Sequence, residues 1–313
     1  MRARGARDNG GRPCHSCRMN DPVRFLLPPR QAERAAAGRH PLVAPFGRVL
    51  DAHGIPWTVA AETPQARLAA VAEGARCVTD RSAPPTPRSL VARRVMGPFY
   101  GIEPQPERWL WAVADAPFPK ARIDAGQARA FADRWRGRLS GGLGIAREGF
   151  VLVPLQGRLA ERRSFQLTSP EEMVARVLAA WPGRVVATLH PREAYGPEDR
   201  AALERMRHPR LEVRTGGTAD LLPRCDGVAT VTSHAGLEGL FLGKPLALFG
   251  RTHFGHLAAG PETLAGWADA PVDADAYLYW LLQLRHVNVD AAFAGRRIEA
   301  ALRRAGWLPD AAH

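Results

Sequence analysis

The stretch of residues 226–250 constrains the fold more than any other part of this chain. It opens with an apolar, β-branched run at residues 228–232, which predicts a strand buried on both faces. Ser233 then stands where it can cap a helix, and Gly243-Lys-Pro ends that helix before a second apolar strand starts at Leu246. A strand, a tight turn, a short helix and a strand in this order indicate a parallel α/β unit.

The predicted helix after Ser233 carries two features that bear on binding. Its free first-turn N–H groups, together with the helix dipole, attract an anion such as a phosphate. Glu238 lies five residues after Ser233, too far along to be a capping-box partner, which would stand three residues after the cap. Glu238 is therefore either a solvent-facing helix residue or a ligand contact.

Strands and helices alternate clearly through the second half of the chain. Before the central strand, strands are expected at residues 150–155, 184–189 and 211–214, and helices at 171–181, 198–207 and near Asp220. Five strands joined by short crossovers predict a doubly wound parallel sheet, whose ligands bind at the carboxyl ends of the strands. Gln156, His190 and Ser233 each directly follow a predicted strand. We therefore expect these three residues to converge on one edge.

His190 is held at the end of its strand by Pro191, because the residue before a proline is kept extended. An imidazole in this place could bond a phosphate oxygen or protonate a departing phosphate. The alternative is a histidine with a purely structural role.

The first half of the chain also predicts an α/β unit. Strands are expected at residues 23–27, 55–60 and 76–79, helices at 40–53, 64–73, 89–96 and 121–139, a loop-rich segment at 97–120 and an interdomain linker at 140–144. The domain prediction is a disordered tail (1–22), an N-terminal α/β domain (23–140), a second α/β domain (141–274) and C-terminal helices (275–313) that pack back on the N-terminal domain or face a membrane surface or a partner.

The chain has 313 residues and a net charge of +12, but its basic residues are almost all arginines, since Lys120 and Lys244 are the two lysines. They are scattered without a basic stripe or a reading motif, so we expect no nucleic-acid binding. Attraction to phosphate-rich donors or to an anionic membrane surface fits the charge equally well. With no signal peptide and no run long enough for a membrane span, the expected location is the cytoplasm, with peripheral attachment to the inner membrane as an alternative.

Cys14 and Cys17 form a CxxC motif near the N-terminus. A zinc site would need a second ligand pair, and none follows, so an unstructured tail is the favoured interpretation. No metal site is predicted.

The pattern Ser233-x4-Glu238-x4-Gly243-Lys-Pro resembles the nucleotide-sugar end of GT-B glycosyltransferases. More narrowly, it resembles the capsular polysaccharide synthesis family, whose members transfer Kdo from CMP-Kdo. Residues 150–156 and 185–192 agree with the same family, so the likeness runs over about a third of the chain, from residue 150 to 255.

The resemblance implies a GT-B-like fold of two Rossmann-like α/β domains, with the acceptor on the side of residues 23–140 and the nucleotide sugar bound by residues 141–274. It implies a metal-independent glycosyltransferase with no cofactor other than its donor nucleotide sugar. By this likeness His190 and Pro191, with Thr232 and Ser233, hold the CMP phosphate, and Glu238 binds the ribose or the base. It implies transfer of Kdo from CMP-Kdo to a lipid-linked or oligosaccharide acceptor during assembly and export of a surface polysaccharide, with contact to capsule assembly proteins.

The chain departs from the family pattern next to Gln156. An Asp is expected four residues after this Gln, whereas this chain has Ala160, followed by Glu161. Either Glu161 is the catalytic carboxylate, together with His190, or the carboxylate lies elsewhere, or the chain is a weak catalyst that binds nucleotide sugars in polysaccharide assembly. Gln156, Arg158 and Arg192 are the expected substrate contacts. Arg158 and its neighbours Arg162 and Arg163 suit an acidic sugar, because guanidinium binds carboxylate in a bidentate manner, or they are solvated surface charge.

Overall fold

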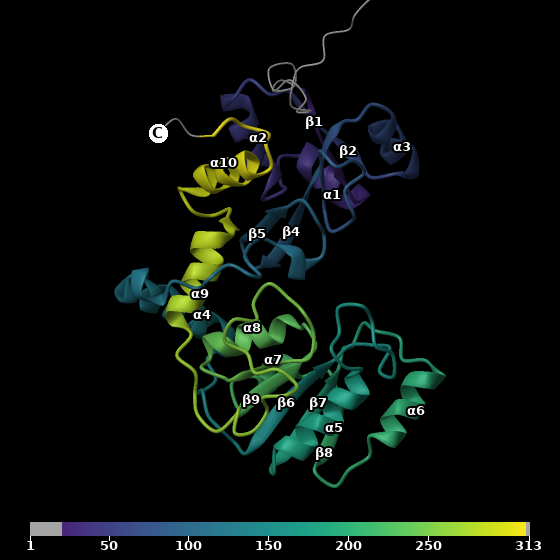
Figure 1. Cartoon of the computed structure of the whole chain (residues 1–313), viewed down its shortest axis with the longest axis vertical. Helices are drawn as coiled ribbons and strands as arrows, with labels where there is room; N and C mark the ends of the chain where they lie inside the picture. The colour runs from purple at the N-terminus through teal and green to yellow at the C-terminus, as the bar shows by residue number, and fades with distance from the viewer. Residues whose placement is uncertain (1–20, 311–313) are drawn as a thin grey trace, which may run out of the picture. The chain divides into compact units, whose positions relative to one another are not determined.

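The computed structural model describes residues 21–310, so the CxxC motif of Cys14 and Cys17 lies outside the described residues. The chain divides into two compact units (Figure 1). Unit 1 comprises the described residues up to Pro106 together with those from Val287 onward, and unit 2 is Glu107–His286. These boundaries differ from the predicted ones at residues 140/141 and 274/275.

Unit 2 contains a five-stranded sheet in the order β10-β9-β6-β7-β8, and all of its strand pairs are parallel. The strands are β6 (Phe150–Leu155), β7 (Arg184–Leu189), β8 (Leu211–Thr215), β9 (Gly227–Thr230) and β10 (Leu246–Leu248). The helices are α4 (Ala125–Ser140), α5 (Pro170–Ala180), α6 (Pro197–Arg205), α7 (Thr218–Leu221), α8 (His234–Phe241) and α9 (Asp275–Tyr279), the last continuing as a π-helix over Trp280–Arg285. The doubly wound sheet predicted for this half of the chain is confirmed.

Helix α4 belongs to unit 2 because it packs on α8 and α9 (Figure 1). The rings of Phe131 and Trp135 lie 5.8 and 5.9 Å from the ring of Phe241, and Arg136 Nε donates to the Phe241 carbonyl at 2.8 Å. Gly141, with φ of 59°, ends α4 in a left-handed C-cap. The glycine-rich segment 140–144 is therefore the end of a helix inside unit 2 and not an interdomain linker.

Unit 1 contains a mixed six-stranded sheet in the order β11-β5-β4-β3-β1-β2. Its strands are β1 (Val23–Leu27), β2 (Trp57–Ala61), β3 (Arg76–Thr79), β4 (Leu90–Met96), β5 (Phe99–Glu103) and β11 (Val287–Asn288). Its α-helices are α1 (Pro29–Ala36), α2 (Val43–Ala52), α3 (Pro64–Ala72) and α10 (Ala294–Arg304). Strands β2, β1, β3 and β4 are parallel, whereas β5 and β11 extend the sheet in the antiparallel sense.

Two predictions were wrong. Residues 89–96 are not a helix, because β4 pairs with β3 on one side and with β5 on the other, and these ladders override the helix-like spacing of its apolar residues. The segment 97–120, predicted to be loop-rich, is mostly irregular and also supplies β5 to the same hairpin. The C-terminal region 275–313 is not all helical, because β11 pairs with β5, and its residues 275–286 belong to unit 2.

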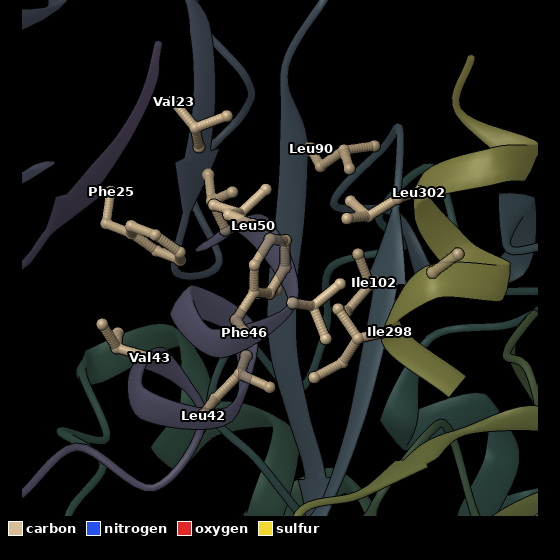
Figure 2. Close-up of a cluster of buried hydrophobic side chains, with 14 of the residues drawn as sticks. Val23, Phe25, Leu42, Val43, Phe46, Leu50, Leu90, Ile102, Ile298 and Leu302 are labelled. Carbon is tan, nitrogen blue, oxygen red and sulfur yellow. The ribbon is translucent and has the colours of Figure 1, made fainter. Parts of the chain in front are cut away.

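The core of unit 1 joins segments that are far apart in sequence (Figure 2). Phe46 of α2 lies among Leu90 and Ile102 of the sheet and Ile298 and Leu302 of α10, and all five side chains are at most 5% exposed. The apolar face of the basic helix α10 is thus covered within unit 1 by α2 and the sheet. Within residues 21–310, no helix is both long enough and apolar enough to cross a membrane.

Candidate functional site

The carboxyl edge of the unit 2 sheet gathers the three polar residues that the sequence placed at strand ends. Strands β9, β6 and β7 are neighbours in the sheet. Gln156 follows β6 and His190 follows β7, and the register pairs Leu155 with Leu189, so the two polar residues start at the same level. Ser233 comes three residues after the end of β9. The predicted convergence on one sheet edge is therefore present in the backbone topology.

Ser233 caps helix α8 as predicted. Its Oγ accepts a hydrogen bond from the Ala235 N–H at 3.3 Å, and its own N–H donates to Thr230 Oγ1 at 3.3 Å. Thr232 and Ser233 are both half-buried at this turn. The side chain of Ser233 satisfies one first-turn N–H, and the positive end of the helix dipole stays directed at this edge.

His190 is exposed and its ring has a defined orientation. Its Nδ1 accepts from the Arg192 N–H at 3.2 Å, and its backbone N–H donates to Tyr195 Oη at 2.8 Å. In the neutral ring the proton therefore sits on Nε2, which has no partner among the described residues and can donate to an anion. Pro191 and Arg192 are exposed beside it, and the Arg192 guanidinium forms no hydrogen bond or ion pair within residues 21–310.

The chain contains a second His-Pro-Arg tripeptide, which serves as an internal reference. His208 Nδ1 accepts from the Arg210 N–H at 3.1 Å, the same local hydrogen bond that His190 makes. However, His208 precedes β8 and so lies at the opposite, amino edge of the sheet. Strand phase, and not the tripeptide, distinguishes the candidate ligand residue from its structural copy.

The loop after β6 carries the remaining predicted residues. Gln156 and Ala160 are exposed, and Arg158 pairs with Glu161 at 3.4 Å on the protein surface. The loop is anchored by Leu159, which is fully buried and whose N–H donates to Asp199 Oδ1 at 2.6 Å. Among the described residues Glu161 contacts the Arg158 side chain and makes no bond to His190. The two predicted catalytic residues are thus not brought together directly.

Glu238 lies on α8 and is half-buried, with no hydrogen bond or ion pair in the described part of the chain. Burial alone raises the pKa of its carboxyl group. The neighbouring Gly236 and Gly239 let α8 lie directly on the sheet, since an added Cβ would come within 2.7 Å of Leu246 and 2.9 Å of Val228. The Glu238 carboxyl group is therefore partly shielded from solvent, but it is not enclosed in the core.

Lys244, by contrast, is structural. Its side chain is 2% exposed, and its Nζ donates to the Ala146 carbonyl at 2.5 Å. Burial lowers the pKa of its amino group, while the nearby Asp226 acts in the opposite direction. The lysine of the Gly-Lys-Pro motif thus fastens the segment before β6 and does not point at a ligand.

The structure adds two residues that were not assigned to the site. A small hollow of about 10 Å³, room for about one water molecule, lies at the ends of β6 and β9, where Gln156, Thr230, Thr232 and Arg163 share its lining. Thr230 also donates to the Pro154 carbonyl at 3.4 Å, which ties the two strand ends together. Arg163 was recognised from sequence as one of three candidate arginines, but nothing in the pattern singled it out. Arg162 does not line this hollow.

Comparison with known proteins supports the resemblance. Residues 198–260 match the family model described as capsule polysaccharide biosynthesis protein, and this stretch holds Thr232, Ser233, Glu238 and Lys244. The resemblance to that family, predicted from sequence, is confirmed over these residues. No curated protein sequence matches the chain.

One solved structure supports the fold at a TM-score of 0.50, and two others match with lower scores. A Thermosulfurimonas dismutans KpsC structure titled beta Kdo 2,7 transferase matches with a TM-score of 0.50 and 14% identity, over 88% of this chain and 98% of that one. The KpsC beta Kdo 2,4 transferase of the same organism matches with a TM-score of 0.42 and 18% identity, over 77% and 84% of the two chains. A UDP co-structure of S. aureus MnaA matches with a TM-score of 0.37 and 12% identity, over 91% and 96%. The predicted GT-B-like α/β fold class is confirmed.

Proposed function

We propose that this chain is a glycosyltransferase of capsule or surface polysaccharide biosynthesis that binds its nucleotide-sugar donor at the carboxyl edge of the unit 2 sheet. The observation that carries the proposal is the placement of Gln156, His190 and Ser233 at the ends of three adjacent strands. A helix N-terminus and an oriented imidazole N–H at one edge suit a phosphate, and they do so without a metal ion. The family match over residues 198–260 supports the same reading.

In the proposed reaction an acceptor hydroxyl oxygen bonds to the anomeric carbon of the sugar while the bond from that carbon to the phosphate oxygen breaks. The acceptor proton passes to a base, and the nucleotide leaves as an anion. His190 Nε2–H donates to the phosphate oxygens and stabilises the charge that develops there. Thr232 and Ser233 complete the phosphate site, Pro191 holds His190 in place, and Glu238 accepts from ribose hydroxyls or a base N–H.

The donor we propose is CMP-Kdo. KpsC, whose fold this chain shares, is described as a Kdo transferase. Gln156, Arg158 and Arg192 are exposed at or next to the strand ends, and guanidinium groups suit the carboxylate of Kdo. The acceptor would be lipid-linked or an oligosaccharide, met in the cytoplasm or at the inner membrane surface.

A second candidate keeps the binding site without the chemistry. Ala160 stands where the family resemblance implies an aspartate, and Glu161 is engaged on the surface with Arg158. A nucleotide-sugar-binding protein of polysaccharide assembly would need His190, Ser233 and Glu238 but no catalytic carboxylate.

Calorimetric titration with CMP, with UDP as the comparison nucleotide, tests the binding site. We expect CMP to bind, and His190→Ala and Glu238→Ala each to weaken it at least about tenfold, which is about 1.4 kcal/mol. His208→Ala is the matched control, because it removes an imidazole with the same local hydrogen bond from the opposite sheet edge. Unchanged affinity in His190→Ala, or an equal loss in His208→Ala, would contradict the placement.

Release of CMP from CMP-Kdo in the presence of acceptor then separates the two candidates. Turnover that Glu161→Gln abolishes, with CMP affinity retained, would support transfer with Glu161 as the base. Binding of CMP without turnover would favour the assembly protein.

A further inference from the structure

Among the described residues, Arg163 is a cation without a counterion at the carboxyl edge of the unit 2 sheet. It lines the same small hollow as Gln156 and Thr232. Within residues 21–310 its guanidinium forms no ion pair and no hydrogen bond, and its Nε is buried. The terminal N–H groups are not among the buried atoms, so they reach the protein surface. The donor site proposed above does not include this side chain.

The backbone explains why Arg163 lies at this edge although β6 has ended well before it. Backbone hydrogen bonds of 2.8 Å join residues 165–167 to residues 249–251, the chain directly after β10. Strand β10 is parallel to β9, so both strands end at the same edge of the sheet. The pairing with residues 249–251 therefore returns the loop after β6 to the carboxyl ends of the strands, where ligands of such sheets bind.

The Arg163 side chain has a defined position. Its Cζ lies 4.8 Å from the centroid of the Phe165 ring, and that ring stacks on Trp109 at 5.6 Å with an interplanar angle of 21°. The Arg163 N–H donates to Gln166 Oε1 at 2.6 Å, and the Gln166 N–H donates to the Arg163 carbonyl at 2.9 Å. A side chain that is ordered in this way loses less conformational freedom when it binds a ligand.

The same segment contains further buried polar atoms that lack partners. Besides Arg163 Nε, they are Gln166 Nε2 and Thr168 Oγ1 within the described part of the chain, and these two residues are 3% and 2% exposed. Buried polar groups without partners are costly in a folded protein. The hollow at Arg163, of about 10 Å³, admits one water molecule and no phosphate. An anion therefore has to lie at its mouth, within reach of the terminal N–H groups of Arg163.

The groups around the hollow favour a phosphate. Thr232 belongs to the turn before α8, where the first-turn N–H groups and the helix dipole attract an anion. Gln156 adds an amide, Thr230 adds a hydroxyl, and Arg163 adds the positive charge. Within residues 21–310 no carboxylate contributes to the lining, so nothing there neutralises the guanidinium.

We propose that Arg163 binds the phosphate of the donor nucleotide next to the turn of Thr232 and Ser233. Its terminal N–H groups donate to phosphate oxygens, a geometry for which the planar guanidinium is well suited. The negative charge on the phosphate rises as the bond to the anomeric carbon breaks, so a fixed cation at this point also stabilises the departing nucleotide. This inference rests on the proposed function, because it adds a residue to the same donor site.

Calorimetric titration of the full chain with CMP and with cytidine tests the inference. The two probes differ only in the phosphate, so the ratio of their affinities reports the phosphate contact and is not altered by a general folding defect. We expect Arg163→Gln to weaken CMP at least about tenfold and to leave cytidine unchanged. Arg163→Lys keeps the charge without the planar fork and should recover part of the loss.

Arg162→Gln is the matched control for the loss of one charge. Arg162 is the preceding residue in the same loop, is exposed and does not line the hollow. At about 0.15 M salt, where exposed charges are screened over roughly 8 Å, its substitution should change CMP affinity less than about twofold.

An unchanged CMP affinity in Arg163→Gln, while His190→Ala still weakens CMP, would overturn this inference alone. An equal loss of CMP and cytidine affinity would assign Arg163 to the base, the ribose or local packing, and it would overturn the phosphate contact. An equal loss of CMP affinity in Arg162→Gln would show a diffuse effect of charge and would also contradict the proposal. Failure of the wild-type chain to bind CMP or UDP would overturn both the proposed function and this inference.

Discussion

The two sheets of this protein place polar residues at the same kind of edge but at different depths. In unit 2, Gln156 and His190 follow strands that end level with each other, and both are exposed. In unit 1, His40 and Tyr100 are more than nine-tenths buried, because the hairpin of β4 and β5 runs past the end of β3. Strand ends thus fix where polar residues gather, while the lengths of neighbouring strands decide how deeply these residues are buried.

The two edges share one backbone feature. Among residues 21–310, the non-glycine residues with positive φ are Arg81, at 68°, and Arg158, at 65°. Arg81 comes two residues after the end of β3 and Arg158 three residues after the end of β6. A left-handed conformation costs a residue with a side chain roughly 1–2 kcal/mol, and such costs cluster at functional sites. Both sheets therefore retain local strain in the loop that follows a strand end.

Phe46→Ala should cause the largest loss of stability among these variants, because it disrupts the core of unit 1 and leaves unit 2 unchanged. Phe46 is fully buried among segments that are distant in sequence, so we expect a loss of about 3–5 kcal/mol in the free energy of unfolding. Urea unfolding followed by circular dichroism measures this loss. Leu68→Ala, at a side chain that is 70% exposed in the same unit, should change stability by less than about 0.5 kcal/mol. Similar losses in both variants would contradict the described core.

Lys244→Met applies the same test to unit 2. The buried Lys244 Nζ donates to the Ala146 carbonyl and ties the segment before β6 to unit 2, so its removal should cost about 1–3 kcal/mol in the free energy of unfolding. Lys120→Met is the natural control, since Lys120 is exposed and is the other lysine of the chain. If the Lys244 variant instead lost CMP affinity at unchanged stability, the lysine would be a ligand contact.

Glu238→Gln should separate stability from binding at the unit 2 edge. Because burial raises the pKa of Glu238 above its unfolded value, the folded state loses stability as pH rises through the folded pKa. The variant avoids this loss and should be more stable at pH 7 by roughly 0.5–1 kcal/mol, with a smaller gain near pH 4. Its CMP affinity should fall, since the anionic acceptor is gone.

Thermal unfolding at both pH values, paired with CMP titration, measures these effects. A variant that is destabilised at pH 7 would show that the carboxylate has a structural partner after all.

Arg81→Gly and Arg158→Gly should give the smallest effects and compare the two edges directly. Each substitution removes the cost of a side chain at a positive φ, but it also adds backbone freedom to the unfolded chain. The net gain in stability should therefore be roughly 0.5 kcal/mol. Arg81→Gly should leave CMP binding unchanged. Chemical denaturation and CMP titration measure this, and a loss of CMP affinity in Arg81→Gly would contradict the placement of the donor at the unit 2 edge.

The sequence predicted unit 2 well because its order is local. Each strand is followed by a helix and then by the next parallel strand, so periodicity alone located β6 to β10 and the residues at their ends. The His-Pro-Arg tripeptide alone does not distinguish His190 from His208. The position of each histidine relative to its strand does, and it placed His190 correctly at the carboxyl edge. Arg163 and Thr230 were not assigned because their shared hollow depends on how separate segments pack.

Unit 1 was less predictable because its sheet depends on distant partners. Residues 90–96 have apolar side chains at both strand and helix spacing, and only the ladders to β3 and β5 decide between them. The burial of His40 and Tyr100 followed from this hairpin, so these two residues carried no signal that could be recognised in the sequence. Whether Glu161 replaces the family aspartate stays a prediction.

Unit 1 is completed by residues that are synthesised after unit 2, because β11 pairs with β5 and α10 packs on α2. A ribosome delivers all of unit 2 before it delivers residues 287–310. Unit 2 can therefore fold during synthesis, while one edge and one face of the unit 1 sheet wait for the last segment to emerge. Until then the apolar surface around Phe46 lacks Ile298 and Leu302, and the nascent chain is most exposed to chaperones and to misassembly in this interval.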